Sequence, residues 1–357
     1  MRFFLLGLFI GIIGGLIPFW MPRSGFELYP EWHGKIDTIA AIEPSNNTAI
    51  AALPLQPIKV EHRILILAGN GELKHEVAPD TLTAVSGNGK YYIAYQKVGN
   101  SIEFFNIRGD RFWKLKSLEY PYLSYHGKLI LLLNGDHSRI RTVDFNSNEI
   151  GVRHLHGRFC TTITFSCHSD LAGIGFLDGS YYVIGENGLI RTAGTAPHHK
   201  PVKGMCLSSR GSFAAIHHGG KENDIITIVN IPEERSAPVE LNNVHLTRTA
   251  MHITESGLLA AIDRDRILIA DADGDILRII KTPEKRVGHA RIEFRRGLLL
   301  VSYTKKTGEA FFLIFRSDGR ILLAKEFPEE PMLDCSITDS VILLRGSRYL
   351  YCYSFSY

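Results

Sequence analysis

A pair of strand-like segments that recurs every 39 to 44 residues is the feature that most constrains the fold of this chain. Each unit holds two short runs rich in Val, Ile, Leu, Tyr and Phe, as in TAVSGNGKYYIAY, GMCLSSRGSFAAIHH and ARIEFRRGLLLVSY. There are eight such pairs, and their leading runs begin near residues 38, 82, 121, 161, 202, 246, 289 and 333. Apolar runs of this length, separated by Gly, Asp, Asn and Ser, indicate β-strands.

A second strand pair follows each of these units. The segments EFFNIRGDRFWKL, LIADADGDILRII and LIFRSDGRILLAK each consist of a strand, a tight turn and another strand. Turns that contain NG, GD or DG favour hairpins. A period of about 40 residues with four strands per unit predicts an all-β fold, a β-propeller. We predict eight four-stranded blades, with seven as the alternative because the first unit is stretched through PLQPIKVEH.

The two ends of the chain are expected to meet. The eighth unit shows only three strands, the last of them in RYLYCYSFSY at the C-terminus. The segment Gly25–Trp32 (GFELYPEW) could supply the missing outer strand and remove an exposed sheet edge. We therefore assign residues 23–357 to the propeller, closed by an N-terminal strand near 25–32.

The units that end in DADGDILRI and RSDGRILLA resemble the quinoprotein-type and WD40-like propellers, including the propeller of the bacterial outer-membrane assembly machine. The resemblance covers about residues 25–357 and implies a propeller fold. The Trp-Asp ending of WD40 blades is absent. The recurring tryptophan of quinone-dependent dehydrogenases is also absent, since only Trp32 and Trp113 lie outside the N-terminal apolar run. No quinone or other cofactor is therefore expected.

The run Phe3–Trp20 contains no charged side chain and is eighteen residues long. As a helix it would extend roughly 27 Å, close to the thickness of a bilayer's hydrocarbon core. Pro18 and Pro22 crowd the place where a signal peptidase would cleave, so residues 1–22 are interpreted as an uncleaved transmembrane signal anchor, with a cleaved signal as the alternative. Arg2 precedes the run, which favours a periplasmic or otherwise extracytoplasmic body.

Three glycines share one face of this expected helix. Gly7, Gly11 and Gly15 recur at intervals of four residues, the small-xxx-small spacing that lets membrane helices approach closely. They are candidates for contact with a membrane partner or with a second copy of the chain. The alternative is that glycine is simply common in membrane helices.

Charge and cysteine content exclude two classes. The formal net charge is +3 and no run of five Lys or Arg occurs, so nucleic-acid binding is not expected. Five cysteines, an odd number, do not form a disulfide framework. All five lie in apolar strand-like runs, which predicts buried free thiols.

Histidines gather at one end of the predicted blades. Loops that join successive blades and loops that join the second and third strands of a blade emerge on the same face of a propeller. The first kind is predicted to hold His156, His198, His199 and His245, and the second His137, His217 and His218. Lys200, Lys203, Lys221, Lys285 and Arg286 fall on the same face. We predict exposed loop histidines and a mildly basic face suited to an acidic protein partner.

No catalytic set is visible in the sequence. GxSxG, HExxH and P-loop motifs are absent. The stretch DADGD (Asp271–Asp275) lacks the register and the final Glu of a calcium loop and matches a hairpin turn. Neighbouring histidines in a strand point to opposite sides, so neither His-His pair alone is a good chelate. Neither a metal nor a catalytic residue is expected.

Two functions from different classes remain. The first is a membrane-anchored extracytoplasmic propeller that serves as a protein–protein interaction scaffold in an envelope complex. The alternative is an enzyme or small-ligand-binding propeller, similar to lactonases or hydrolases, that uses the central channel. The innermost segments TAVS, TITF, GMCL and RIEF are mostly apolar or small, which favours the scaffold.

Overall fold

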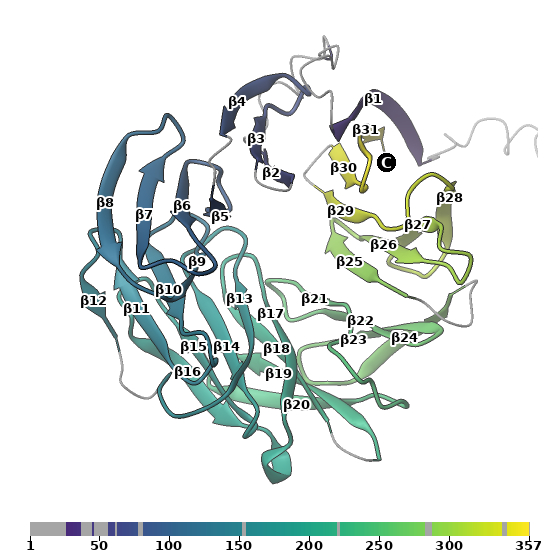
Figure 1. The fold of residues 1–357 in the computed structure, drawn as a ribbon. Coiled ribbons are helices and arrows are strands. Elements are labelled where there is room, and N and C mark those ends of the chain that lie inside the picture. Colours follow the sequence, from purple (N-terminus) through teal and green to yellow (C-terminus); the bar gives the residue numbers. More distant parts are fainter. Residues whose placement is uncertain are drawn as a thin grey trace, which may run out of the picture.

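The chain folds into eight antiparallel sheets arranged as a ring, an eight-bladed β-propeller (Figure 1). The structure is a computed structural model that describes residues 26–36, 45, 56–60, 63–77, 81–151, 155–219, 222–282, 288–337 and 341–356. Seven sheets have four strands, and the eighth has three within the described residues. The prediction of eight blades rather than seven is confirmed.

In every blade but the last, the described strands follow the chain from the centre outward (Figure 1). The first sheet along the chain holds β2 (Gln56–Val60), β3 (Arg63–Leu67) and β4 (Leu73–Val77). The next two hold β5 (Leu82–Val85), β6 (Tyr91–Tyr95), β7 (Ser101–Asn106) and β8 (Arg111–Lys116), then β9 (Tyr120–Leu123), β10 (Leu129–Leu133), β11 (Ile140–Asp144) and β12 (Glu149–Ile150). The two after them hold β13 (Cys160–Phe165), β14 (Ala172–Phe176), β15 (Ser180–Ile184) and β16 (Ile190–Thr195), then β17 (Val202–Leu207), β18 (Phe213–Gly219), β19 (Asp224–Asn230) and β20 (Arg235–Glu240).

The remaining blades complete the ring. They hold β21 (Met251–Ile253), β22 (Leu259–Asp263), β23 (Arg266–Ala270) and β24 (Ile276–Lys281), then β25 (Ala290–Arg295), β26 (Leu298–Thr304), β27 (Ala310–Arg316) and β28 (Ile321–Phe327). The last blade holds β29 (Asp334–Ile337), β30 (Val341–Arg345), β31 (Tyr349–Ser356) and β1 (Glu27–Lys35). One short 3-10 helix, η3 (Pro197–His199), lies between β16 and β17.

The strand near the N-terminus closes the ring. β1 pairs antiparallel with β31 over its whole length, from Glu27 opposite Ser356 to Lys35 opposite Tyr349. Figure 1 shows these two segments from opposite ends of the sequence side by side. β1 therefore covers the edge of β31 and completes the last blade. Among the described sheets, β2–β3–β4 alone has three strands.

Turn residues explain the recurrent first hairpin of a blade. In three blades a serine after the innermost strand accepts a hydrogen bond from the N–H five residues later, in the pairs Ser86–Tyr91, Ser124–Leu129 and Ser208–Phe213, each at 3.0 Å. A glycine three residues after the serine has positive φ, as at Gly211 (φ 85°). The positive φ favours glycine, and a Cβ there would also lie 1.9 Å from Leu171 Cδ1 of the preceding blade, which would have to shift.

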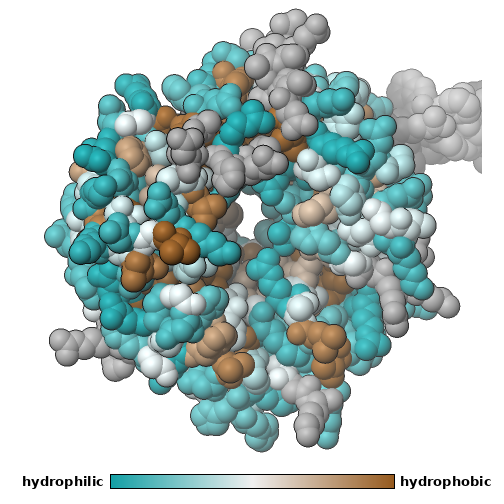
Figure 2. All heavy atoms as spheres, in the orientation of Figure 1, coloured by the Kyte–Doolittle hydropathy of each residue, from teal (hydrophilic) through white to brown (hydrophobic). Residues whose placement is uncertain are grey.

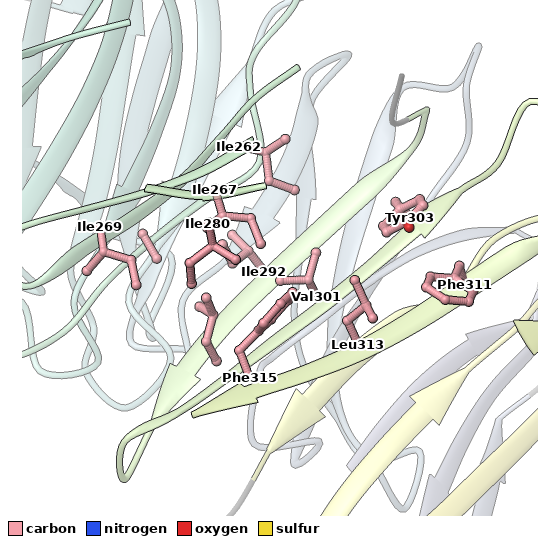
Figure 3. Close-up of a cluster of buried hydrophobic side chains, with 12 residues drawn as sticks. Ile262, Ile267, Ile269, Ile280, Ile292, Val301, Tyr303, Phe311, Leu313 and Phe315 are labelled. Carbon is pink, nitrogen blue, oxygen red and sulfur yellow. The ribbon is translucent and has the colours of Figure 1, made fainter. Parts of the chain in front are cut away.

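Apolar side chains between neighbouring blades form the core. Figure 3 shows one such cluster, in which Ile262, Ile267 and Ile269 of one blade meet Val301, Leu313 and Phe315 of the next. All are at most 4% exposed. At roughly 25 cal/mol per Å² of apolar area, burial of this kind at every blade interface is the main stabilising contribution.

One leading strand differs from the sequence prediction, and another stays a prediction. The strand expected near residue 38 falls on residues outside the described part. The strand expected near 246 begins at Met251. The reason is that residues before it donate their backbone N–H groups to buried side chains: Asn242 to Asp263, His245 to Asp224 and Thr249 to His217. Those N–H groups are therefore unavailable to a strand partner.

The N-terminal anchor prediction lies outside the described residues, and so do Gly7, Gly11 and Gly15. Within the part of the chain that the structure covers, no helix has the length and apolar character needed to cross a membrane.

Candidate interaction face

Each blade presents two sets of loops on opposite faces of the ring. One face carries the loops that join successive blades and the loops between the second and third strands of each blade. We call it the linker face. The other set joins first to second and third to fourth strands and forms the hairpin face. Because strands alternate in direction, each loop's face follows from its place in the blade.

Exposed apolar side chains concentrate in the loops of the linker face. Of thirteen large hydrophobic residues that are exposed within the described chain, seven lie in strands. Only one, Leu189, lies in a loop of the hairpin face. Five lie in loops of the linker face: Val98 (94% exposed), Leu118 (76%), Phe159 (50%), Leu177 (52%) and Leu246 (99%). The loops of the linker face therefore carry more exposed apolar side chains than those of the hairpin face.

The structure places most of the predicted face residues on the linker face. His198 and His199, in η3, and His156 are exposed, whereas Lys200 and His245 are half-buried. His198 and His199 both have left-handed backbone conformations, with φ of 55° and 53°. Lys221, Lys285 and Arg286 lie outside the described residues.

The prediction that His217 and His218 are exposed loop residues is wrong. Both lie in β18, which continues to Gly219, and both side chains are fully buried. They point to opposite sides of the strand: His217 contacts Asp224, and His218 Nε2 lies 2.7 Å from the Thr227 hydroxyl. Neither can belong to an exposed interaction surface.

His217 belongs to a polar network within and between two blades. Its Nδ1 accepts the Thr249 backbone N–H (3.2 Å), which leaves Nε2–H to donate to the Asp224 carboxylate (2.9 Å). Asp224 also accepts hydrogen bonds from the Lys203 ammonium (2.8 Å) and the His245 N–H (2.9 Å). Burial lowers the pKa of His217 to about 4, against the opposing effect of Asp224. The imidazole is therefore neutral at pH 7.

A second carboxylate continues the network. Asp263 lies 3.1 Å from His245 Nε2 and accepts hydrogen bonds from Arg266 (2.7 Å) and Asn243 (2.8 Å). Burial opposes ionisation of Asp263, but these partners hold its pKa well below the usual range. Every carboxylate oxygen in the network has a partner and His217 has no exposed surface. The arrangement joins blades rather than offering a reactive group to a substrate.

Buried histidines predict the protein's response to acid. Burial lowers the pKa of His217, His218 and His252 to about 4. In the unfolded chain histidine titrates near 6.5, so stability should be lost as pH falls from 6.5 towards 4. We expect His218→Leu to reduce the pH dependence of the unfolding free energy, because about one proton fewer is taken up on unfolding. Urea unfolding at several pH values measures it, with exposed His156→Leu as the control. An unchanged slope would contradict the assignment.

The first strands of the blades surround a central channel, which is open in the space-filling view (Figure 2). The sequence predicts that this wall is mostly apolar or small, and Glu293 of β25 is one of the charged residues in it. Its carboxylate accepts the Ile337 N–H of the neighbouring β29 at 2.9 Å, and burial raises its pKa to about 7. The sequence signal was the single acidic residue inside the run RIEF.

A cavity of about 640 Å³ lies on the hairpin face and gathers titratable residues from neighbouring blades. Its lining includes His126, His168, Asp170, Glu186 and Glu234. Asp170 accepts hydrogen bonds from the Ser124 hydroxyl (2.5 Å) and the His126 N–H (2.8 Å), and Glu186 pairs with Lys128 (3.0 Å). Among the described residues no group of three His, Cys, Asp or Glu could hold a metal ion.

Cysteines are free, but their burial differs from the prediction. Cys160, Cys335 and Cys352 are buried and Cys206 is half-buried. Cys167 is exposed, because β13 ends at Phe165 and Cys167 lies in the following turn. The prediction of five buried thiols is therefore wrong at this position.

Comparisons with known proteins identify the fold. No protein-family model matches the chain, and no protein of curated function matches it. Among solved structures it is similar to BamB from Moraxella catarrhalis, with a TM-score of 0.60 and 9% sequence identity over 93% of this chain and 98% of that chain. It also matches the β-propeller domain of Cps50 (Swd1) from Myceliophteria thermophila, with a TM-score of 0.45 and 13% identity over 71% of this chain and 96% of that one. The chain is thus a β-propeller that resembles BamB in fold.

Proposed function

We propose that this protein is a membrane-anchored extracytoplasmic propeller that serves as a protein-interaction scaffold in an envelope complex. The observation that carries the proposal is the concentration of exposed apolar loop residues on the linker face. A closed ring holds these loops on a rigid base, so little ordering cost opposes binding. The likeness in fold to BamB supports the same assignment, together with the sequence resemblance to the propeller of the bacterial outer-membrane assembly machine.

The membrane part of the proposal rests on the sequence of Phe3–Trp20. An anchor confines the ring to a membrane surface and raises its effective concentration towards partners in the same membrane. Gly7, Gly11 and Gly15 would let the helix pack closely against a partner helix or against a second copy of this chain.

Crosslinking in native membranes, followed by purification and identification of the bound proteins, tests the scaffold. Full-length protein is compared with a Phe159→Asp/Leu246→Asp variant of the linker face and with a Gly7/Gly11/Gly15→Leu variant. We expect reproducible partner proteins that are lost in the linker-face variant. The matched control is Leu189→Asp on the hairpin face, which should retain them. Absence of any partner with wild-type protein would refute the scaffold function.

The alternative function, an enzyme or small-ligand-binding protein, has its own structural support in the 640 Å³ cavity with His126, His168 and Asp170. Its carboxylates Asp170 and Glu186 already have partners in the fold, which weakens the case for catalysis. The test is a screen of lactone and ester substrates with wild type and His126→Ala. Hydrolysis that the substitution abolishes would favour the enzyme over the scaffold.

A further inference from the structure

A groove of about 600 Å³ lies on the linker face between the blades β5–β8 and β9–β12. Two segments of the blade β5–β8 supply one side, including Asn100, Lys116 and Leu118. The loop from Asn134 to Arg139 supplies the other. The Ser117 N–H donates to the Asn100 carbonyl (2.9 Å) and joins the two segments of the first side. The two sides are held together by Glu119, which pairs with Arg141 (2.9 Å) and lies 3.7 Å from Arg139. We call this feature the Arg139 groove.

The Arg139 groove is positively charged. Its lining contains three cations, Lys116, Arg139 and Arg141, and one carboxylate, Glu119, while a second carboxylate, Glu149, lies 3.5 Å from Arg141. Arg141 holds the Glu119 carboxylate through Nε at 2.9 Å and Nη2 at 2.5 Å. The Arg139 side chain is half exposed, and Lys116 has no ion-pair partner within the described residues. Lys116 is therefore available to a ligand, and Arg139 offers a half-exposed guanidinium that lies 3.7 Å from Glu119.

Exposed apolar side chains flank the groove on both sides. Val98 and Leu118 lie in loops of the blade β5–β8 and are among the most exposed hydrophobic residues of the described chain. On the other side the His137 ring stacks on the Phe159 ring, with centroids 5.6 Å apart. Leu177 lies beside them, because its N–H donates to the Phe159 carbonyl (2.9 Å). Leu118 in the lining, and Phe159 against the loop that forms the other side, place exposed apolar side chains near the Lys116 cation, which suits a ligand with both apolar and anionic groups.

We propose that the Arg139 groove docks an extended segment of a partner protein in which carboxylates alternate with apolar side chains. The proposal rests on the scaffold function and specifies its contact site and the chemistry of its partner. Carboxylates of the segment would pair with Arg139 and Lys116, and its apolar side chains would cover Leu118 on one side and Phe159 on the other. Charge complementarity of this kind raises the rate of encounter and fixes the register of binding.

Binding of synthetic peptides to the full-length protein in detergent tests the groove. The probe is a short fluorescein-labelled peptide in which Glu alternates with Leu and Phe, followed by fluorescence anisotropy. Two matched peptides replace every Glu by Lys, or every Leu and Phe by Ser. We expect the first peptide to bind and each matched peptide to bind at least about tenfold more weakly, since each loses one of the two complementary features.

Protein variants locate the site. Lys116→Glu/Arg139→Glu and Leu118→Asp should each weaken binding of the first peptide at least about tenfold. Arg108→Glu and Leu189→Asp, at exposed positions on the hairpin face, introduce the same changes elsewhere and should leave binding intact. Equal loss in the control variants, or equal binding of an oligothymidylate, would overturn the proposal, because either result means that charge alone attracts the probe.

The same variants separate this proposal from the scaffold function. If Lys116→Glu/Arg139→Glu loses the peptide but keeps every crosslinked partner in native membranes, the groove is not the docking site and the scaffold stands. Loss of both the peptide and the partners in this variant, with both retained in Arg108→Glu, would support the groove. Absence of partners with wild-type protein refutes the scaffold itself.

Discussion

Replacing Trp32 by alanine is expected to lower the free energy of unfolding by about 3–5 kcal/mol, as for other buried large aromatic residues. Trp32 lies in β1 and is 7% exposed. Its indole N–H donates to the Gly69 carbonyl of the first blade (2.9 Å), and its ring packs with Leu65, Leu350 and Cys352. One side chain thus joins the closing strand to both the last and the first blade. Chemical unfolding followed by far-UV circular dichroism measures the loss.

Gly71 shows how closely this contact is built. The residue has φ of 87°, and a Cβ there would lie 2.8 Å from the Trp32 ring. The small glycine lets the indole lie directly against the turn of the neighbouring blade. Alanine at position 32 would leave a cavity where the closing strand meets the first and last blades, and the surrounding strands could fill it only by moving.

Trp113→Ala provides the matched control. Trp113 also donates its indole N–H, to the Phe145 carbonyl at 2.9 Å, but it is only half-buried and it joins two blades that are consecutive in the chain. Its loss should therefore cost less. Loss of the β1 contact should also expose the edge of β31, so size-exclusion chromatography should show oligomers for Trp32→Ala alone. Equal destabilisation of the two variants, without oligomers, would show that Trp32 does not secure the closure.

The blade repeat could be predicted from sequence because its determinants are local. Strand length and apolar alternation recur from unit to unit, turn residues such as Ser208 and Gly211 recur in three of them, and none of these features requires knowledge of distant contacts. The pairing of β1 with β31 followed from a missing strand in the last unit. Blade number was thus recoverable from the chain alone.

Side-chain environments could not be predicted in the same way. His217 and His218 stand at the end of an apolar run next to Gly219 and Gly220, which looked like the start of a loop. The strand continues because Asp224, seven residues later, accepts a hydrogen bond from His217 Nε2–H, and the Thr249 N–H, 32 residues later, donates to the other ring nitrogen. The Arg139 groove was also missed, since its two sides come from different blades and its apolar member, Leu118, is a single residue in a short loop.

Glu293→Gln is expected to stabilise the protein at alkaline pH by about 3 kcal/mol relative to wild type, since the pKa rises by about 2.5 units and each unit corresponds to about 1.4 kcal/mol. Burial raises the pKa of Glu293 from 4.5 to about 7, against the opposing effects of the Ile337 N–H and Arg295. The folded state therefore keeps a proton that the unfolded chain releases above pH 4.5. Stability from this group is complete below pH 4.5 and is lost as pH rises through 7.

Glutamine suits the site because its amide oxygen can still accept the Ile337 N–H while carrying no charge at any pH. Wild type and Glu293→Gln should therefore unfold at similar urea concentrations near pH 4.5 and diverge towards pH 8. The matched control, Glu103→Gln, should behave oppositely. Hydrogen bonds from Lys114 and Arg111 lower the pKa of Glu103, so its replacement should remove stability that is present above pH 4.5. Parallel curves for wild type and Glu293→Gln across this range would show that the Glu293 carboxyl ionises as it does in water, and that the wall between β25 and β29 is open to solvent.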